Sequence, residues 1–291
     1  MQWTPENRDC PVCKSSSRRT IGRRGGKSHR AGLGEEATVV RCKDCSVLYT
    51  YPTLLPQGNP YNEISFDDYF ENHPTESKVA TGDYLAKRAE KLIEVGSVLE
   101  VGCGGGWLLQ GFAMRGWKCT GVEMTEAFAN EAESRGITII RQSAEEVEFS
   151  EKYDLIIFPA VLEHLYNPKE VLQKCVSALK PDGIIHIEVP NESALSLTAG
   201  NFYHKIKGRD WTINLSPTFP PFHVVGFNPK SIRRLIESVG LKIESLELAL
   251  YNTTLPESAT KTERTAMKLI QRVGSILGRG DGIGVWARKP K

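Results

Sequence analysis

The feature that most constrains this sequence is a glycine-rich segment that directly follows a short apolar run. Residues 97–108 read SVLEVGCGGGWL, with four glycines in the five positions from Gly102 to Gly106. An apolar strand followed by a glycine turn and a helix is typical of α/β proteins that hold a nucleotide at this junction. The dinucleotide pattern G-x-G-x-x-G fits at Gly102 and Gly104, but its third glycine falls on Trp107. The segment therefore predicts a nucleotide-like ligand other than a dinucleotide.

Glu100, two residues before the first glycine, indicates the charge of that ligand. A carboxylate that faces a pyrophosphate meets like charge across a partly desolvated gap, which is unfavourable. The same carboxylate stabilises a ligand that carries an ammonium and a sulfonium. These observations favour S-adenosylmethionine, an adenosine with positive charge where the dinucleotides carry phosphates.

Strand and helix signals alternate along the chain, which predicts a parallel sheet covered by helices on both faces. The expected strands are residues 98–101, 118–123, 138–140, 154–158, 184–189, 242–250 and 283–287. The expected helices are residues 106–115, 126–135, 168–179 and 229–239, preceded by a helix from about Ser77. The last two strands lack a short crossover, so we expect an antiparallel pair at one edge. Between them lies a basic amphipathic helix, for which packing on the sheet or on a partner is favoured over a membrane.

Acidic and polar residues follow the central strands, where ligands of such sheets bind. Glu123 ends the second strand, and its carboxylate can accept hydrogen bonds from both ribose hydroxyls. Residues after the third strand are predicted at the adenine edge, and Glu163 and His164 after the fourth face the same crevice. The predicted cofactor-binding residues are Glu100, Gly102, Cys103, Gly104, Glu123, Met124, Ser143, Ala144, Glu145 and Pro159.

Several of these segments together resemble one known family. VLEVGCGGG, GVE, QSAEE, YDLIIFPAVLEHLYNP and LKPDGIIHIEVPN make residues 97–190 similar to class I S-adenosylmethionine-dependent methyltransferases. The resemblance implies a Rossmann-like seven-stranded sheet with helices on both faces, S-adenosylmethionine as the methyl donor, and Glu123 on the ribose. Ser143 stands where this family often has aspartate.

Two C-x-x-C pairs near the start of the chain predict a metal site rather than a disulfide framework. Cys10 and Cys13 stand in CPVC, and Cys42 and Cys45 stand in CKDC. Four cysteines can enclose a tetrahedral Zn²⁺ with no open position, which indicates a structural ion; free thiols or a redox pair are the alternatives. RCKDCSVLYTYP resembles the second half of the small zinc ribbons that precede some methyltransferases of sugar and secondary-metabolite pathways.

These signals divide the chain into three expected parts. Residues 1–55 are the zinc ribbon, residues 56–76 a linker with several turn residues, and residues 77–291 the S-adenosylmethionine-dependent methyltransferase domain. No apolar run approaches the roughly 20 residues of a transmembrane helix, and the N-terminus lacks the apolar core of a signal peptide. A cytoplasmic location is therefore expected.

A basic segment lies between the two cysteine pairs. Residues 1–55 carry ten Lys and Arg against five Asp and Glu, within a chain of net charge +2. The segment contains Arg18, Arg19, Arg23, Arg24, Lys27 and Arg30. These side chains suit phosphate groups of RNA or of a nucleotide-linked substrate. The segment lacks the interleaved aromatic residues that single-stranded nucleic acids stack on, so a solvated hairpin tip is the favoured interpretation.

Two histidines are predicted to act on the methyl acceptor. His164 follows the fourth strand, and His223 precedes the F-x-P-x-S start of a later helix. Histidine suits proton transfer at neutral pH; packing beside the cofactor and a buried structural histidine are the respective alternatives. Residues 190–231 are expected to form a long loop that covers the substrate, with Tyr203, His204 and Trp211 as weaker candidates for the acceptor pocket.

The sequence thus predicts a biosynthetic methyltransferase whose acceptor is a small molecule such as a sugar, nucleotide-sugar or secondary metabolite. One alternative is an RNA methyltransferase, for which replacing Arg23 and Arg24 by glutamate should abolish RNA binding. Another is a non-catalytic scaffold, which predicts no affinity for S-adenosylhomocysteine. The acceptor atom and the oligomeric state do not follow from the sequence.

Overall fold

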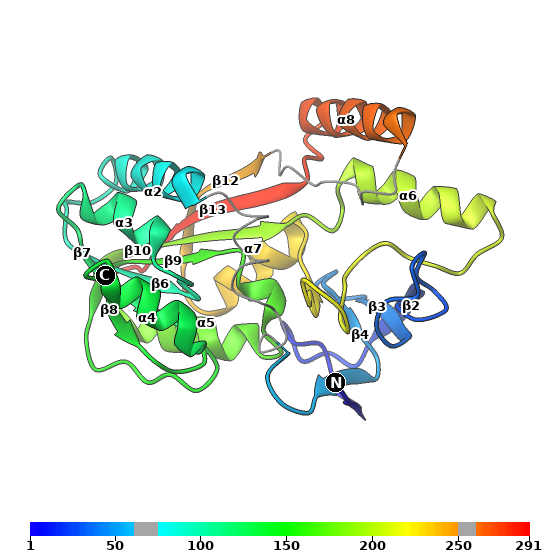
Figure 1. Ribbon diagram of the computed structural model, residues 1–291, viewed down its shortest axis with the longest axis horizontal. Helices are drawn as coiled ribbons and strands as arrows, with labels where there is room; N and C mark the ends of the chain where they lie inside the picture. The colour runs from blue at the N-terminus through cyan, green and yellow to red at the C-terminus, as the bar shows by residue number, and fades with distance from the viewer. Residues whose placement is uncertain (61–74, 250–259) are drawn as a thin grey trace.

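The computed structural model describes residues 1–60, 75–249 and 260–291 (Figure 1). Its centre is a seven-stranded sheet with the strand order β12-β13-β10-β9-β6-β7-β8. The strands are β6 (Ser97–Val101), β7 (Lys118–Val122), β8 (Thr138–Ile140), β9 (Tyr153–Pro159), β10 (Leu179–Pro190), β12 (Lys242–Ala249) and β13 (Gly282–Arg288). All seven coincide with predicted strands, and Leu250 of the sixth prediction lies outside the described residues.

The five strands from β8 to β10 are parallel, and β13 runs antiparallel to both β10 and β12. Parallel neighbours need crossover connections, which helices provide. The crossover and flanking helices are α2 (Thr75–Ala89), α3 (Trp107–Ala113), α4 (Glu126–Ser134), α5 (Pro168–Ala178) and α7 (Pro229–Ser238). The predicted fold class and the antiparallel edge are confirmed.

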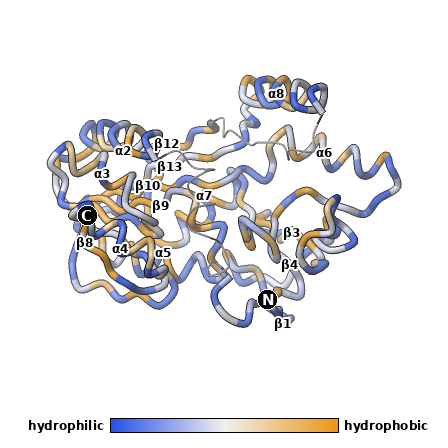
Figure 2. The backbone as a smooth tube through the Cα atoms, viewed as in Figure 1, coloured by the Kyte–Doolittle hydropathy of each residue, from blue (hydrophilic) through white to orange (hydrophobic). Residues whose placement is uncertain are grey.

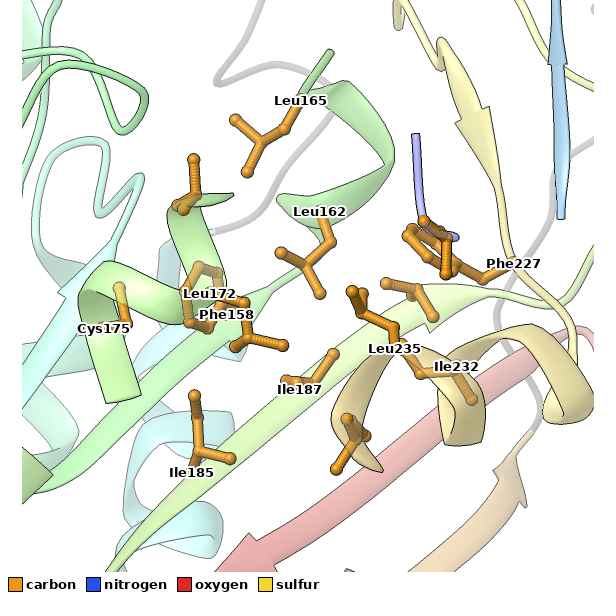
Figure 3. Close-up of a cluster of buried hydrophobic side chains, with 14 of the residues drawn as sticks. Phe158, Leu162, Leu165, Leu172, Cys175, Ile185, Ile187, Phe227, Ile232 and Leu235 are labelled. Carbon is orange, nitrogen blue, oxygen red and sulfur yellow. The ribbon is translucent and has the colours of Figure 1, made fainter. Parts of the chain in front are cut away.

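Side chains of the central strands alternate between two apolar layers, because successive residues of a strand point to opposite faces. Leu99 packs in the layer under α5 and α7, whereas its neighbour Val98 packs with α2, α3 and α4. Figure 3 shows the first layer, where Leu172 of α5 and Leu235 of α7 lie with Phe158 of β9. Apolar residues are concentrated in these inner strands (Figure 2).

The N-terminal segment forms short antiparallel strands beside the large sheet (Figure 1). They are β1 (Trp3–Glu6), β2 (Arg18–Arg24), β3 (Ala37–Cys42), β4 (Leu48–Thr50) and β5 (Thr53–Pro56). A distant strand, β11 (Val225–Gly226), pairs with β4 and completes a four-stranded sheet in the order β11-β4-β3-β2. Val12 and Tyr49 belong to the same buried cluster as α5 and α7, so one apolar layer extends from the sheet into this segment.

Residues 190–231 are not the long loop that the sequence predicts. They contain α6 (Leu195–Ile206) and the strand β11. Between these elements the chain follows the N-terminal strands, where Arg23 N donates to Asp210 O at 2.8 Å and Thr212 N donates to Arg23 O at 2.9 Å. The segment therefore joins the two halves of the chain. The late helix α8 (Lys261–Ile276) contacts α6 and stands apart from the sheet at the top of Figure 1.

Candidate functional site

The glycine segment forms a turn between β6 and α3, at the point where the strand order reverses. β6 lies between β7 and β9, so the chain leaves it in one direction and later returns on the other side. In open α/β sheets this switch point holds the ligand. Gly102 and Gly104 have positive φ angles of 69° and 52°, and a Cβ on Gly104 would meet no atom within 4 Å. The turn therefore presents bare backbone toward open space.

Gly106 precedes α3 in a left-handed conformation, with φ 75° and ψ 12°. An added Cβ would also lie 3.1 Å from the Cβ of Ala132. We expect Gly106→Ala to lower the free energy of unfolding by about 1–2 kcal/mol, because L-residues are strained in this conformation. Urea unfolding measures this change. Gly284→Ala, where the nearest atom lies at 3.9 Å and φ is not positive, serves as the control; equal effects of both substitutions would contradict the conformational argument.

Glu100 lies under this turn as a buried carboxyl group, 3% exposed. Its Oε2 atom has no hydrogen-bond partner among the described residues. Burial raises the pKa of Glu100 well above its ordinary value; Lys78 opposes the shift and Glu123 adds to it. A buried acceptor without a donor is costly. A cationic ligand with N–H donors at this position would satisfy it, as the sequence predicts.

Glu123 follows β7 and points back at the glycine turn. Its Oε2 accepts a hydrogen bond from Gly104 N at 3.0 Å, and its Oε1 accepts one from Thr125 N at 2.7 Å. Each carboxylate oxygen has two lone pairs, so further donors can bind. Met124 beside it is 47% exposed, whereas Cys103 is buried and its Sγ packs over Gly121. Cys103 therefore offers only its backbone to a ligand.

Two of the residues predicted at the adenine edge, Ser143 and Glu145, have side-chain hydrogen bonds within the chain. Ser143 Oγ donates to a carboxylate oxygen of Glu146 at 2.9 Å and accepts from Glu146 N at 3.2 Å. Glu145 Oε1 accepts from Asn167 N at 2.9 Å. The side chain of Ala144 packs against the apolar layer, and Pro159 is half-buried at the end of β9. In this arrangement Ser143 stabilises its own loop, and Glu145 connects that loop to the start of α5.

Three polar side chains converge beyond the end of β9. A short 3-10 turn, η2 (Leu162–His164), carries Glu163 and His164, and His223 lies beside them. The rings of His164 and His223 are 4.8 Å apart at their centroids, and His223 Nε2 lies 4.0 Å from Glu163 Oε1. The structure thus brings the two predicted catalytic histidines together. We call Glu163, His164 and His223 the acceptor cluster.

Burial changes the protonation of every member of the acceptor cluster. Glu163 is 2% exposed, and neither of its carboxyl oxygens has a hydrogen-bond partner among the described residues. Desolvation raises the pKa of Glu163 to about 8 and lowers that of His164 to about 4 and that of His223 to about 3. Burial thus favours the neutral form of all three side chains.

Strained backbone supports the acceptor cluster on both sides. Ala160 just before η2 and Phe222 just before His223 have φ angles of 57° and 62°, in the left-handed region that non-glycine residues seldom adopt. Such strain persists where the surroundings enforce it, often at functional sites. A Cβ on Gly102 would lie 3.0 Å from Cγ2 of Val161, so this turn packs directly against the glycine turn.

The sequence did not single out Glu163 as an unpaired buried acid. The letters LEH place it beside His164, and a distant segment contacts its backbone, where Val224 N donates to Glu163 O at 2.8 Å. The weaker candidates lie in another environment. The centroid of the His204 ring is 5.3 Å from that of Trp211, and the backbone of Trp211 forms an isolated parallel β-bridge with Arg23 of β2.

The four N-terminal cysteines also converge. Cys10 Sγ and Cys45 Sγ are 3.4 Å apart, Cys13 Sγ and Cys42 Sγ are 3.5 Å apart, and all four sulfur atoms lie within 4.8 Å of one another. Zn–S bonds of about 2.3 Å place tetrahedral sulfur ligands about 3.8 Å apart. The donor set and its spacing fit Zn²⁺.

The model of one protein family, described as a methyltransferase domain, matches residues 73–246. The chain belongs to this family, which confirms the resemblance found in the sequence. A ubiquinone biosynthesis O-methyltransferase of Marinobacter nauticus is 30% identical over 164 residues, 53% of this chain and 67% of that protein. Its counterpart in Actinobacillus pleuropneumoniae is 31% identical over 147 residues, 46% of this chain and 60% of that protein.

Two solved structures share the fold. A SAM-dependent methyltransferase from Archaeoglobus fulgidus superposes with a TM-score of 0.53 at 20% identity, over 77% of this chain and all of that one. The plantazolicin methyltransferase BpumL in complex with SAH gives a TM-score of 0.52 at 14% identity, over 77% of this chain and 88% of that one. Among the described residues, no helix is both long and apolar enough to cross a membrane.

Proposed function

We propose that this protein transfers the methyl group of S-adenosylmethionine to an oxygen atom of a small molecule. The observation that carries the proposal is the buried carboxyl of Glu100, whose Oε2 has no hydrogen-bond partner among the described residues, below the glycine turn at the switch point of the sheet. The curated relatives named above are O-methyltransferases, which favours oxygen as the acceptor. A sugar, nucleotide-sugar or secondary metabolite remains the proposed class of acceptor.

Each residue of the site has its own role in this proposal. Glu100 accepts hydrogen bonds from the ligand's ammonium, Glu123 accepts them from the ribose, and the glycine turn packs on the ligand through its backbone. S-adenosylmethionine supplies a methyl group already activated by its sulfonium, which leaves to an in-line nucleophile. The acceptor cluster then has to orient the acceptor hydroxyl and take its proton. His223 is the proton acceptor in this proposal because it is neutral and 22% exposed at the side chain.

The depressed histidine pKa predicts an unusual pH profile. An ordinary histidine, with a pKa near 6.5, is mostly protonated at pH 5.5 and cannot act as a base. Because burial holds the pKa of His223 near 3, we expect kcat/KM, which reports the free enzyme, to remain near its neutral value from pH 7 down to about 5. His223→Asn should lower kcat about 100-fold across this range, and His204→Asn should not. A kcat/KM of the unsubstituted enzyme that falls to half its neutral value near pH 6.5 would contradict the assignment.

The methyl donor and the class of acceptor can be tested together. Purified protein is incubated with S-adenosylmethionine labelled on its methyl group and an extract of the source organism, and label is counted in small molecules, lipids, protein and RNA. Label in small molecules or lipids supports the proposal and provides material for identifying the product. Label in RNA would instead support the alternative in which the basic segment binds RNA. Label in protein would overturn the proposed acceptor class, and no transfer into any fraction would leave the scaffold alternative.

The structure assigns partners to part of the basic segment. Arg24 donates to Leu215 O at 3.1 Å, and burial lowers its pKa to about 10. Arg23 lies 3.1 Å from carboxylate oxygens of both Glu36 and Asp210. These contacts support a structural role. Replacing Arg24 by glutamate would bury an unpaired charge, so the exposed Lys27 is a better position for testing RNA binding.

We further propose that the four clustered cysteines bind a structural Zn²⁺ in a ribbon over residues 1–55, joined by residues 56–76 to a methyltransferase domain over residues 77–291. Each pair lies on a tight turn whose left-handed residue is Lys14 or Ser46. Lys14 N donates to Cys10 O at 2.9 Å, and Ser46 N donates to Cys42 O at 3.1 Å. The matching turns direct both cysteine pairs at one point.

A further inference from the structure

We propose that Arg19 and Arg41 bind a phosphoryl group, phosphate or diphosphate, of the methyl acceptor. The two residues are directly opposite each other on the antiparallel strands β2 and β3. Directly opposed side chains of such strands lie on the same face of the sheet, where two like charges repel each other. An anion with two negative charges would bind between the guanidinium groups and replace this repulsion by two charge-assisted contacts.

The side chain of Arg41 supplies an independent observation that points to an anion. Arg41 is half-buried, and its Nε atom is buried without a hydrogen-bond partner among the described residues. Neither Arg41 nor the exposed Arg19 forms an ion pair within the described part of the chain. Glu192 attracts Arg41 only from a longer distance. A buried donor without an acceptor is costly, and a bound phosphoryl oxygen would satisfy it.

The other arginines of β2 already have partners. Those of Arg23 and Arg24 are given above, and Arg18 lies opposite Cys42 on the face of the sheet that holds the four cysteines. Arg41 precedes Cys42 in β3 and therefore points to the opposite face, because successive residues of a strand alternate. Its charge is thus not directed at the zinc site. Of the arginines in β2 and β3, the opposed pair is the one that can bind a further anion.

A row of paired residues leads from the two arginines toward the acceptor cluster. Arg41 is opposite Leu48 of β4, and Leu48 is opposite Gly226 of β11. A Cβ on Gly226 would lie 2.6 Å from Cγ of Glu192, so this buried acid packs on the far end of the row. Burial and, to a smaller extent, Glu192 raise the pKa of Glu163, a member of the acceptor cluster. The row thus extends over two strand spacings, about 10 Å, from the neighbourhood of the acceptor cluster to Arg41.

This arrangement favours the phosphoryl group of an elongated small molecule. When the acceptor hydroxyl lies at the acceptor cluster, the anionic end of such a molecule can reach the arginine pair along the row. This assignment to the acceptor rests on the proposed function. A single-stranded nucleic acid would need a line of cations and aromatic rings for its bases. The row instead continues through Leu48 and Gly226 to a buried carboxyl group, which disfavours a continuous chain of phosphates.

Calorimetric titration of the full-length, zinc-loaded protein with inorganic phosphate and with pyrophosphate tests the anion site without the acceptor. We expect at least one of the two anions to bind, and Arg19→Gln and Arg41→Gln should each weaken that binding at least about tenfold. Arg233→Gln, at an exposed arginine of α7, is the matched control and should bind as the unsubstituted chain does. No binding of either anion at millimolar concentration, or equal loss in the control, would overturn the proposal. Zinc content and affinity for S-adenosylhomocysteine, measured on the same samples, show that each variant is folded.

Methyl transfer into the small-molecule fraction of the extract tests the link to the acceptor. Arg41→Gln should raise the amount of extract that gives half the maximal rate at least about tenfold and change the maximal rate much less. The reason is that the phosphoryl contact is made equally before and during the transfer. Unchanged half-saturation in Arg41→Gln would overturn the assignment to the acceptor.

Two further results separate the possible failures. A single-stranded RNA oligonucleotide that binds, and that loses affinity in both Arg19→Gln and Arg41→Gln, would assign the pair to RNA and overturn the proposal. Absence of any methyl transfer by the unsubstituted chain would contradict the proposed function. The titrations with phosphate and pyrophosphate decide independently whether the arginine pair binds a phosphoryl group, so the two failures are distinguishable.

Discussion

Replacing Cys45 by serine is expected to release zinc and to lower the melting temperature by on the order of 10 °C. The apparent free energy of structural zinc binding in isolated zinc-finger peptides is about 10–16 kcal/mol, and it stabilises the folded state directly. Cys45 and its partner Cys10 are buried in the same apolar layer as α5 and α7. Loss of the ion should therefore cost at least about 3 kcal/mol, which corresponds to such a shift in a chain of this size.

Zinc content by mass spectrometry and thermal unfolding by circular dichroism measure the two parts of this prediction. Cys119→Ala is the control, because Cys119 is also a buried thiol but lies outside the four-cysteine cluster. It should retain one zinc per chain and lose only the stability of a small buried side chain. Full zinc content in Cys45→Ser would contradict the structural role of the ion. An unsubstituted protein that is purified without zinc and has the melting temperature of the zinc-containing protein would contradict it as well.

Glu123→Ala is expected to weaken binding of S-adenosylhomocysteine at least about 100-fold. A carboxylate that accepts hydrogen bonds from two ribose hydroxyls contributes about 1.5–3 kcal/mol for each bond. The substitution also removes the acceptor that holds Gly104 N and Thr125 N, so the glycine turn loses its anchor to the end of β7. Both effects weaken the cofactor site and leave the acceptor cluster in place.

Calorimetric titration with S-adenosylhomocysteine gives the affinity of each variant. Glu126→Ala, an exposed acid at the start of α4, is the matched control and should bind normally. Binding to the unsubstituted chain that is lost only in Glu123→Ala would exclude a scaffold with a dead cofactor pocket. Equal affinities in both variants would show that Glu123 does not contact the ribose.

Much of the central sheet follows from local patterns. The strands β6, β7, β8 and β9 appear in the sequence as short apolar runs, and β6 and β7 are followed by Gly102 and Glu123. The glycine turn, Glu100 and Glu123 were predictable because each lies at the end of an apolar strand, which the sequence pattern shows. The cysteine cluster was predictable for a similar reason, since C-x-x-C spacing fixes the local turn.

The remaining features depend on contacts between distant segments. Glu145 was predicted at the adenine edge, yet its carboxylate binds Asn167 N, a partner 22 residues away. Arg24 belongs to a basic run, yet its guanidinium bonds to Leu215 O and stacks over Phe219. The stretch between α6 and β11 follows the N-terminal strands, where Arg23 N donates to Asp210 O, and no local pattern shows this contact. Within the described part of the chain, the carboxyl oxygens of Glu163 have no hydrogen-bond partner, which no local sequence pattern reveals.

The shared sheet of β4 and β11 has a consequence for how the chain reaches its final form. Asn228 Nδ2 donates to Ser46 O at 2.7 Å across a separation of 182 residues, and β11 pairs with β4 at a similar distance in sequence. Contacts between such distant residues form slowly, because a long loop must close first. The cysteine pairs can bind an ion early in synthesis, but the four-stranded sheet beside them is complete only after five of the seven strands of the large sheet have been made. We therefore expect the acceptor cluster to form late in folding. A chain that ends before residue 228 would leave the apolar edge of β4 exposed and open to aggregation.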